Sequence, residues 1–228
     1  MSESTMNNTS NATDPPVRLN MQSPRSAGLA GIIFSLLFGA SLILIELSMP
    51  PLPSINAEWL PNQAGRISLA MTLMPFGGIA FLWFIGVVRD QVGALEDKFF
   101  STIFLGSGLL FLSAMFTWAA IVSAVLSSYD AASDTWLTSD AYIFSQTMLQ
   151  QLAGMVALRM AGVFMMSSGT IWLRTKVMPL WMVVTTYGIA LVLLLGGSTF
   201  NGLRLGFPIW VFVVSLWILR KNRLRRED

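Results

Sequence analysis

The chain contains neither cysteine nor histidine, and only 11% of its 228 residues are charged. The two missing residue types exclude disulfides, thiolate chemistry, haem held by His or Cys, iron–sulfur clusters and the usual zinc sites. Without histidine the chain also lacks the commonest general base. We therefore expect no metal and no cofactor.

Charge is scarce because most of the chain is apolar. Hydrophobic residues make up 54% of the sequence and the mean hydropathy is +0.64, whereas a soluble domain carries roughly 25% charged residues. A surface so poor in charge faces lipid, so we predict an all-α, polytopic transmembrane bundle in contact with the bilayer. The length suits one bundle and no second globular domain.

The apolar residues form six stretches, and a helix needs about 20 such residues to cross a bilayer. The predicted spans are Ala27–Leu47, Ile67–Val88, Phe99–Leu126, a span within Ala141–Leu173, Val177–Gly197 and Leu203–Leu219. Together they form a bundle over residues 27–219, and we expect the last span to be the shortest.

Polar tails flank this bundle. Residues 1–26 are rich in Ser, Asn, Thr and Pro, which predicts a disordered tail. Residues 220–228 form a basic tail that suits anionic lipid, and we expect no nucleic-acid partner. Six spans place both tails and two basic loops on one side, while the loop between the third and fourth spans is purely acidic. By the positive-inside rule, both termini are predicted to be cytoplasmic.

Three local patterns refine the spans. Ser139 or Asp140 is placed to cap the fourth helix, whose first part we expect to extend beyond the membrane. Pro75, in the middle of the second span, could break the helix as in some transporters, but an ordinary kink is favoured. Small residues at fourfold spacing predict packing seams, namely Ala27, Gly31, Ser35 and Gly39 in the first span and Ala153, Ala157 and Ala161 in the fourth.

Arg159 is the main candidate for a functional residue, because it lies inside the fourth span. An arginine within the bilayer costs about 2.5–3.5 kcal/mol on insertion scales and usually marks a function or an ion pair. The alternative is that Arg159 extends outward to the interface. Glu46, at the end of the first span, is the partner we hypothesise across a shallow, outward-facing cavity; otherwise it is a solvated interfacial carboxylate.

Glutamines accompany Arg159 on the fourth helix. Gln151, Met155 and Arg159 share one face at i, i+4 and i+8, and Gln146 and Gln150 lie beside it. We expect this polar face to point into the bundle or to lie above the membrane. Gln150 and Gln151 are therefore candidate binding residues, although hydrogen bonding between helices is the favoured explanation.

Two stretches resemble an uncharacterised family of bacterial, actinobacterial-type, multi-span membrane proteins. They are RISLAMTLMPFGGIAFLWFIGVVRDQVGALEDKFFSTIFLGSGLLFLSA, residues 66–114, and LRMAGVFMMSSGTIWLRTKVMPLWMVVTTYGIALVLL, residues 158–194. The resemblance covers about half of the chain. It implies a bacterial plasma (inner) membrane and no known reaction, so it assigns no functional residue.

Three classes of function stay open. An accessory or interaction subunit, with a protein partner or as a homo-oligomer, fits the lack of catalytic motifs, the packing seams and the basic tail. A small-solute transporter or channel fits Arg159, Glu46 and Pro75. A cofactor-free membrane enzyme fits least, because general acids and bases are scarce at membrane depth. Transport predicts a polar cavity that reaches Arg159, and an accessory role predicts a tightly packed interior.

Overall fold

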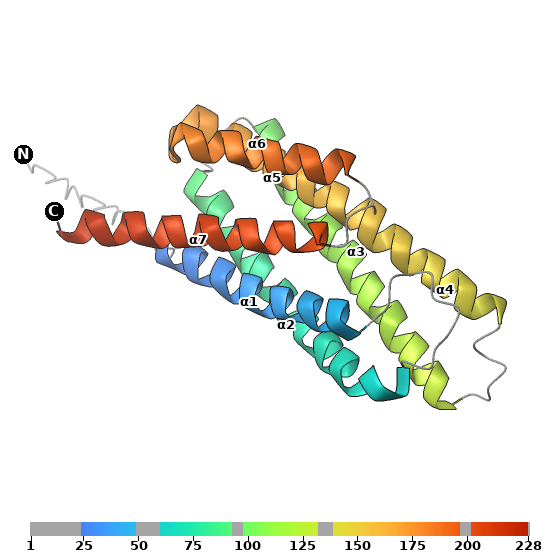
Figure 1. Cartoon of the computed structure of the whole chain (residues 1–228). Helices are drawn as coiled ribbons and strands as arrows, with labels where there is room; N and C mark the ends of the chain where they lie inside the picture. The colour runs from blue at the N-terminus through green and yellow to red at the C-terminus, as the bar shows by residue number, and fades with distance from the viewer. Residues whose placement is uncertain (1–23, 49–59, 93–97, 132–138, 197–201, 228) are drawn as a thin grey trace, which may run out of the picture.

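The computed structural model describes residues 24–48, 60–92, 98–131, 139–196 and 202–227 (Figure 1). Helices account for 96% of these residues, which include no strand, so the predicted all-α bundle is confirmed. The elements are α1 (Pro24–Ser48), α2 (Leu60–Val92), α3 (Lys98–Ala131), α4 (Asp140–Gln151), the π-helical turn η2 (Leu152–Ala157), α5 (Leu158–Thr175), α6 (Leu180–Leu195) and α7 (Leu203–Glu227).

Among the residues that the structure describes, five helical segments are long and apolar enough to cross a membrane. They are Ser26–Ser48, Asn62–Arg89, Phe99–Tyr129, Asp140–Thr175 and Leu203–Lys221. Most of the predicted tail 1–26 lies outside the described residues, but its last three residues belong to α1. At the other terminus, α7 continues as a helix through residues 220–227, so most of the predicted basic tail extends the last span.

Of the helices that correspond to the six predicted spans, the shortest is α6 and not the last one, so this prediction was wrong. Its 16 residues extend about 24 Å, less than the roughly 30 Å of a bilayer core. Nevertheless, each end of α6 lies against one end of α7. Lys221, late in α7, donates a hydrogen bond from Nζ to the carbonyl of Val177 just before α6, at 2.8 Å. At the opposite end, Gly196 adjoins Leu203, the first residue of α7.

The fourth span is one continuous helical rod made of α4, η2 and α5. Ser139 is its N-cap, as predicted, and its Oγ accepts a hydrogen bond from the backbone N–H of Tyr142 at 3.3 Å. The extra residue of a π turn widens the helix locally, and such turns are frequent at functional sites. Here the turn occupies Leu152–Ala157, two residues before Arg159.

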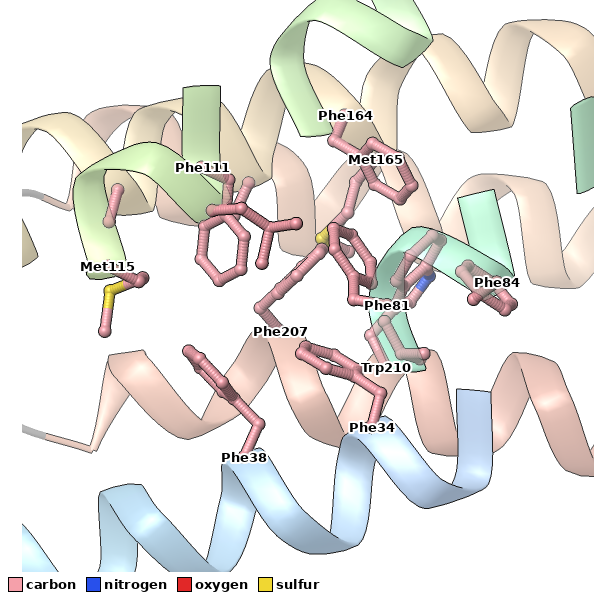
Figure 2. Close-up of a cluster of buried hydrophobic side chains, with 14 of the residues drawn as sticks. Phe34, Phe38, Phe81, Phe84, Phe111, Met115, Phe164, Met165, Phe207 and Trp210 are labelled. Atoms are coloured by element: carbon pink, nitrogen blue, oxygen red, sulfur yellow. The ribbon is translucent and has the colours of Figure 1, made fainter. Parts of the chain in front are cut away.

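The helices pack around an aromatic core. α1 contacts both α2 and α7 along its length, while α3 and α6 both pack on α5 (Figure 1). Phenylalanine rings from α1, α2, α3, α5 and α7 point toward one another (Figure 2). The rings of Phe111 and Phe207 are 4.7 Å apart, and those of Phe81 and Phe164 are 5.2 Å apart. Interlocked rings of this kind fix how the helices meet.

Glycines allow the closest helix contacts. A Cβ on Gly31 would overlap Oγ of Ser215 on α7, and a Cβ on Gly77 would lie 3.2 Å from the backbone nitrogen of Phe38 on α1. At Gly31, the packing seam predicted on the first span is therefore a close contact between α1 and α7. Around Pro75, α2 stays a continuous helix from Leu60 to Val92, which argues against a broken helix.

Candidate functional site

One cavity opens between α1, α3, α7 and the η2–α5 segment. It encloses about 520 Å³ of empty space, including its opening. The space in which the centre of a water molecule fits is much smaller, about 20 Å³. Since one water requires at least about 10–15 Å³ by this measure, the cavity is a narrow pocket and not an open channel.

The two charged residues of the cavity lining are Glu46 and Arg204. Glu46 lies near the end of α1 and Arg204 is the second residue of α7, so both lie at the same end of the bundle. Along the helix axes, Glu46 is about 30 Å from Ser26 and Arg204 is about 25 Å from Lys221. These lengths place the pair near one boundary of the apolar slab.

Small residues on the fourth span form one wall of this cavity. Ala153 and Ala157 come from η2 and Ala161 from α5, and all three are buried. The predicted seam at these positions thus has a different role. Short side chains here leave space facing α1 and α3, where larger ones would fill it.

The floor of the cavity is aromatic and aliphatic. Phe38, Phe111 and Phe207 line it and belong to the aromatic core, in which Phe34, Phe81 and Phe164 follow further into the bundle (Figure 2). Rings packed to this density leave no polar route from the cavity through the described core. Trp118, 2% exposed, also lines the cavity.

Arg159 does not line the cavity. It is partly exposed on α5, while Gln151 and Met155 on the same face are exposed, Met155 to 48%. This face therefore points out of the bundle, so the prediction that it points inward was wrong for its membrane part. The reason is that the three alanines, not the polar residues, turn toward α1 and α3. Gln150 is partly buried beside this face.

The sequence pattern predicted Glu46 beside a shallow cavity but did not indicate its charged neighbour. Arg204 faces Glu46 across the cavity, whereas the hypothesised pair of Glu46 with Arg159 is not formed within the described ranges. A signal for Arg204 was present, because it is one of only two basic residues that six spans place on the acidic side of the membrane, the other being Arg66. Nothing in the sequence pattern indicated the π turn or the role of Trp118.

Chemically, the cavity combines an apolar interior with one anion and one cation at its mouth. Such a site places an apolar surface beside two opposite charges, and its described lining residues offer no hydroxyl or thiol nucleophile. The fold and its apolar spans define a multi-pass helical membrane protein. Comparison of the chain with protein-family models, curated proteins and solved structures finds no match.

Proposed function

We propose that the chain is an accessory subunit that docks a transmembrane helix of a partner protein on the outward face of its fourth span. The observation that carries this proposal is a row of residues on the outside of the bundle, Gln151, Met155 and Arg159. We call this row the polar stripe, because its first and last residues are polar. We place the protein in a bacterial plasma membrane with both termini in the cytoplasm, as the charge pattern and the family resemblance predict.

The depth of Arg159 supports this proposal. Arg159 lies about 24 Å from Thr175 along the helix, within a bilayer core of about 30 Å. Within the described ranges it makes no hydrogen bond or ion pair. Lipid is a poor environment for such a group, and intramembrane arginines are commonly paired.

The partner is expected to carry an aspartate or glutamate within its own span. A carboxylate in lipid is costly by itself, so pairing with Arg159 stabilises both helices in the assembly. A second copy of this chain fits the stripe less well, because a two-fold interface would bring two copies of Arg159 together. Gln151 supplies a further hydrogen-bonding group for the same helix.

Transport is the weaker alternative. Transport predicts a polar cavity that reaches Arg159. Below Glu46 and Arg204, however, the cavity is lined by apolar residues, and Arg159 lies outside it. The enzyme alternative has even less support, since one carboxylate and one guanidinium are the only charged groups among the lining residues that the structure describes.

Photocrosslinking in the native membrane tests the docking proposal. A photoreactive amino acid replaces Met155 on the stripe, and the matched control replaces Leu191, a lipid-exposed residue of α6 (54% exposed). We expect an adduct with one membrane protein from position 155 and none from position 191. The adduct should disappear with Arg159→Gln, persist with Arg159→Lys, and map to a span that contains a carboxylate.

Crosslinks from position 155 to lipid alone would overturn the proposal, and so would an adduct that Arg159→Gln leaves unchanged. An adduct between two copies of this chain would replace the hetero-complex with a homo-oligomer.

A further inference from the structure

The charges at the cavity mouth oppose the dipoles of their own helices. Glu46 lies two residues before the end of α1, where free carbonyls give the helix a negative end, and Arg204 lies in the first turn of α7, where free N–H groups give a positive end. Each helix end therefore repels the charge placed on it. The arrangement therefore concentrates negative potential on one side of the mouth and positive potential on the other.

Backbone groups extend this separation of charge. The first N–H groups of α7 point toward the same end of the bundle as the guanidinium of Arg204. An anion is attracted to the α7 side of the mouth, and a cation to the α1 side.

Trp118 adds an independent sign of a ligand. Its indole Nε1–H is buried and has no hydrogen-bond partner within the described part of the chain. A buried donor left unsatisfied destabilises the fold, because it loses its hydrogen bond to water and gains no other. Because Trp118 lines the cavity, an acceptor oxygen on a bound molecule would satisfy this donor.

We propose that the cavity binds a zwitterionic phospholipid with a primary ammonium head group, such as a phosphatidylethanolamine, from the surrounding leaflet. The phosphate faces Arg204 and the N-terminus of α7, while the ammonium faces Glu46 and the C-terminus of α1. An ester oxygen accepts from Trp118, and the first part of one acyl chain enters between the three alanines and Met115. Methionine is flexible enough to move aside and widen this narrow space. This proposal does not depend on the docked partner.

The test is native mass spectrometry of the full chain in detergent, with phosphatidylethanolamine and phosphatidylglycerol of identical acyl chains supplied in equal amounts. We expect the ethanolamine lipid to be retained at least about fivefold more, which corresponds to about 1 kcal/mol. Glu46→Gln should abolish this preference, and Arg204→Gln should lower retention of both lipids. Ala157→Phe, which fills the cavity, should abolish retention, whereas its control Ala120→Phe, on the exposed face of α3, should leave it unchanged.

Equal retention of the two lipids by the unaltered chain would overturn the proposal, as would equal retention by the Ala157→Phe and Ala120→Phe variants. If Ala157→Phe fails to fold, Glu46→Gln decides the question, since Glu46 is exposed at a helix end and its neutralisation leaves the packing intact. Retention of detergent in place of either lipid would also refute a lipid site.

Discussion

Replacing Gly31 with alanine should weaken the contact between α1 and α7. The new Cβ would overlap Oγ of Ser215 and lie 2.9 Å from Cδ2 of Phe84, and Ser215 and Phe84 are both buried. Extra atoms in a packed interior cost about 1–3 kcal/mol. Against this, exchanging glycine for alanine within a helix gains up to about 1 kcal/mol.

A matched control separates these two effects. Gly86 on α2 has nothing within 4 Å of its would-be Cβ, so Gly86→Ala has the helical gain without the clash. We expect Gly31→Ala to be less stable than Gly86→Ala by about 1–3 kcal/mol, or about 5- to 150-fold in the unfolding equilibrium. Adding Ser215→Ala should restore part of the loss, because the overlapping hydroxyl is removed and that hydroxyl has no hydrogen-bond partner in the described structure.

Unfolding in mixed micelles with a rising fraction of sodium dodecyl sulfate provides the measurement. The 8 tryptophans give an intrinsic fluorescence signal. The reasoning is refuted if Gly31→Ala and Gly86→Ala unfold at the same detergent fraction. It is also refuted if Ser215→Ala changes the stability by the same amount in the unaltered chain as in the Gly31→Ala variant.

The same unfolding assay tests one buried hydrogen bond, and the absence of cysteine allows a separate test of the topology. Thr186→Val should cost about 0.6–1.7 kcal/mol of stability, because it removes the buried acceptor of the Trp210 Nε1–H at 2.9 Å. Thr186→Ser keeps the hydroxyl and should retain stability. An equal loss in both variants would contradict this role for the hydroxyl. Single cysteines introduced by Ser10→Cys, Ala94→Cys and Ser133→Cys should report the topology in intact cells, since the native chain has no cysteine. An impermeant maleimide should label only Ser133→Cys before the membrane is permeabilised, and labelling of Ser10→Cys in intact cells would reverse the predicted orientation.

The spans were predictable because their signal is local and strong. In lipid every backbone polar group must be satisfied within the chain, so long apolar runs form helices whatever their neighbours are. The capping signal of Ser139 is local too, because its side chain accepts from the backbone of Tyr142 only three residues later. Ser139 was therefore identifiable as a cap. The error about the shortest span has a local cause too, because Pro179 and Gly196 shorten α6 at its two ends.

The candidate site was predictable only in part. Its charged residues were visible because charge is rare at that depth, but which of them meet depends on the order of helices around the bundle. The sequence pattern suggested Glu46 with Arg159, while the packing of α1 against α7 brings Glu46 to Arg204. The three alanines of the fourth span have the same spacing as a packing seam, and spacing cannot distinguish a seam from a cavity wall.

The sequence by itself determined that this is an all-α membrane protein, roughly where its spans lie, and which few residues are charged within them, because apolar length and helix caps act over one turn or one bilayer thickness. Tertiary structure alone decided that Arg159 faces out of the bundle, that Glu46 and Arg204 share a cavity mouth, and that rings from α1, α3 and α7 close its floor. These outcomes depend on how helices far apart in sequence rotate and pack, and close-packed side chains, not local propensity, set that rotation.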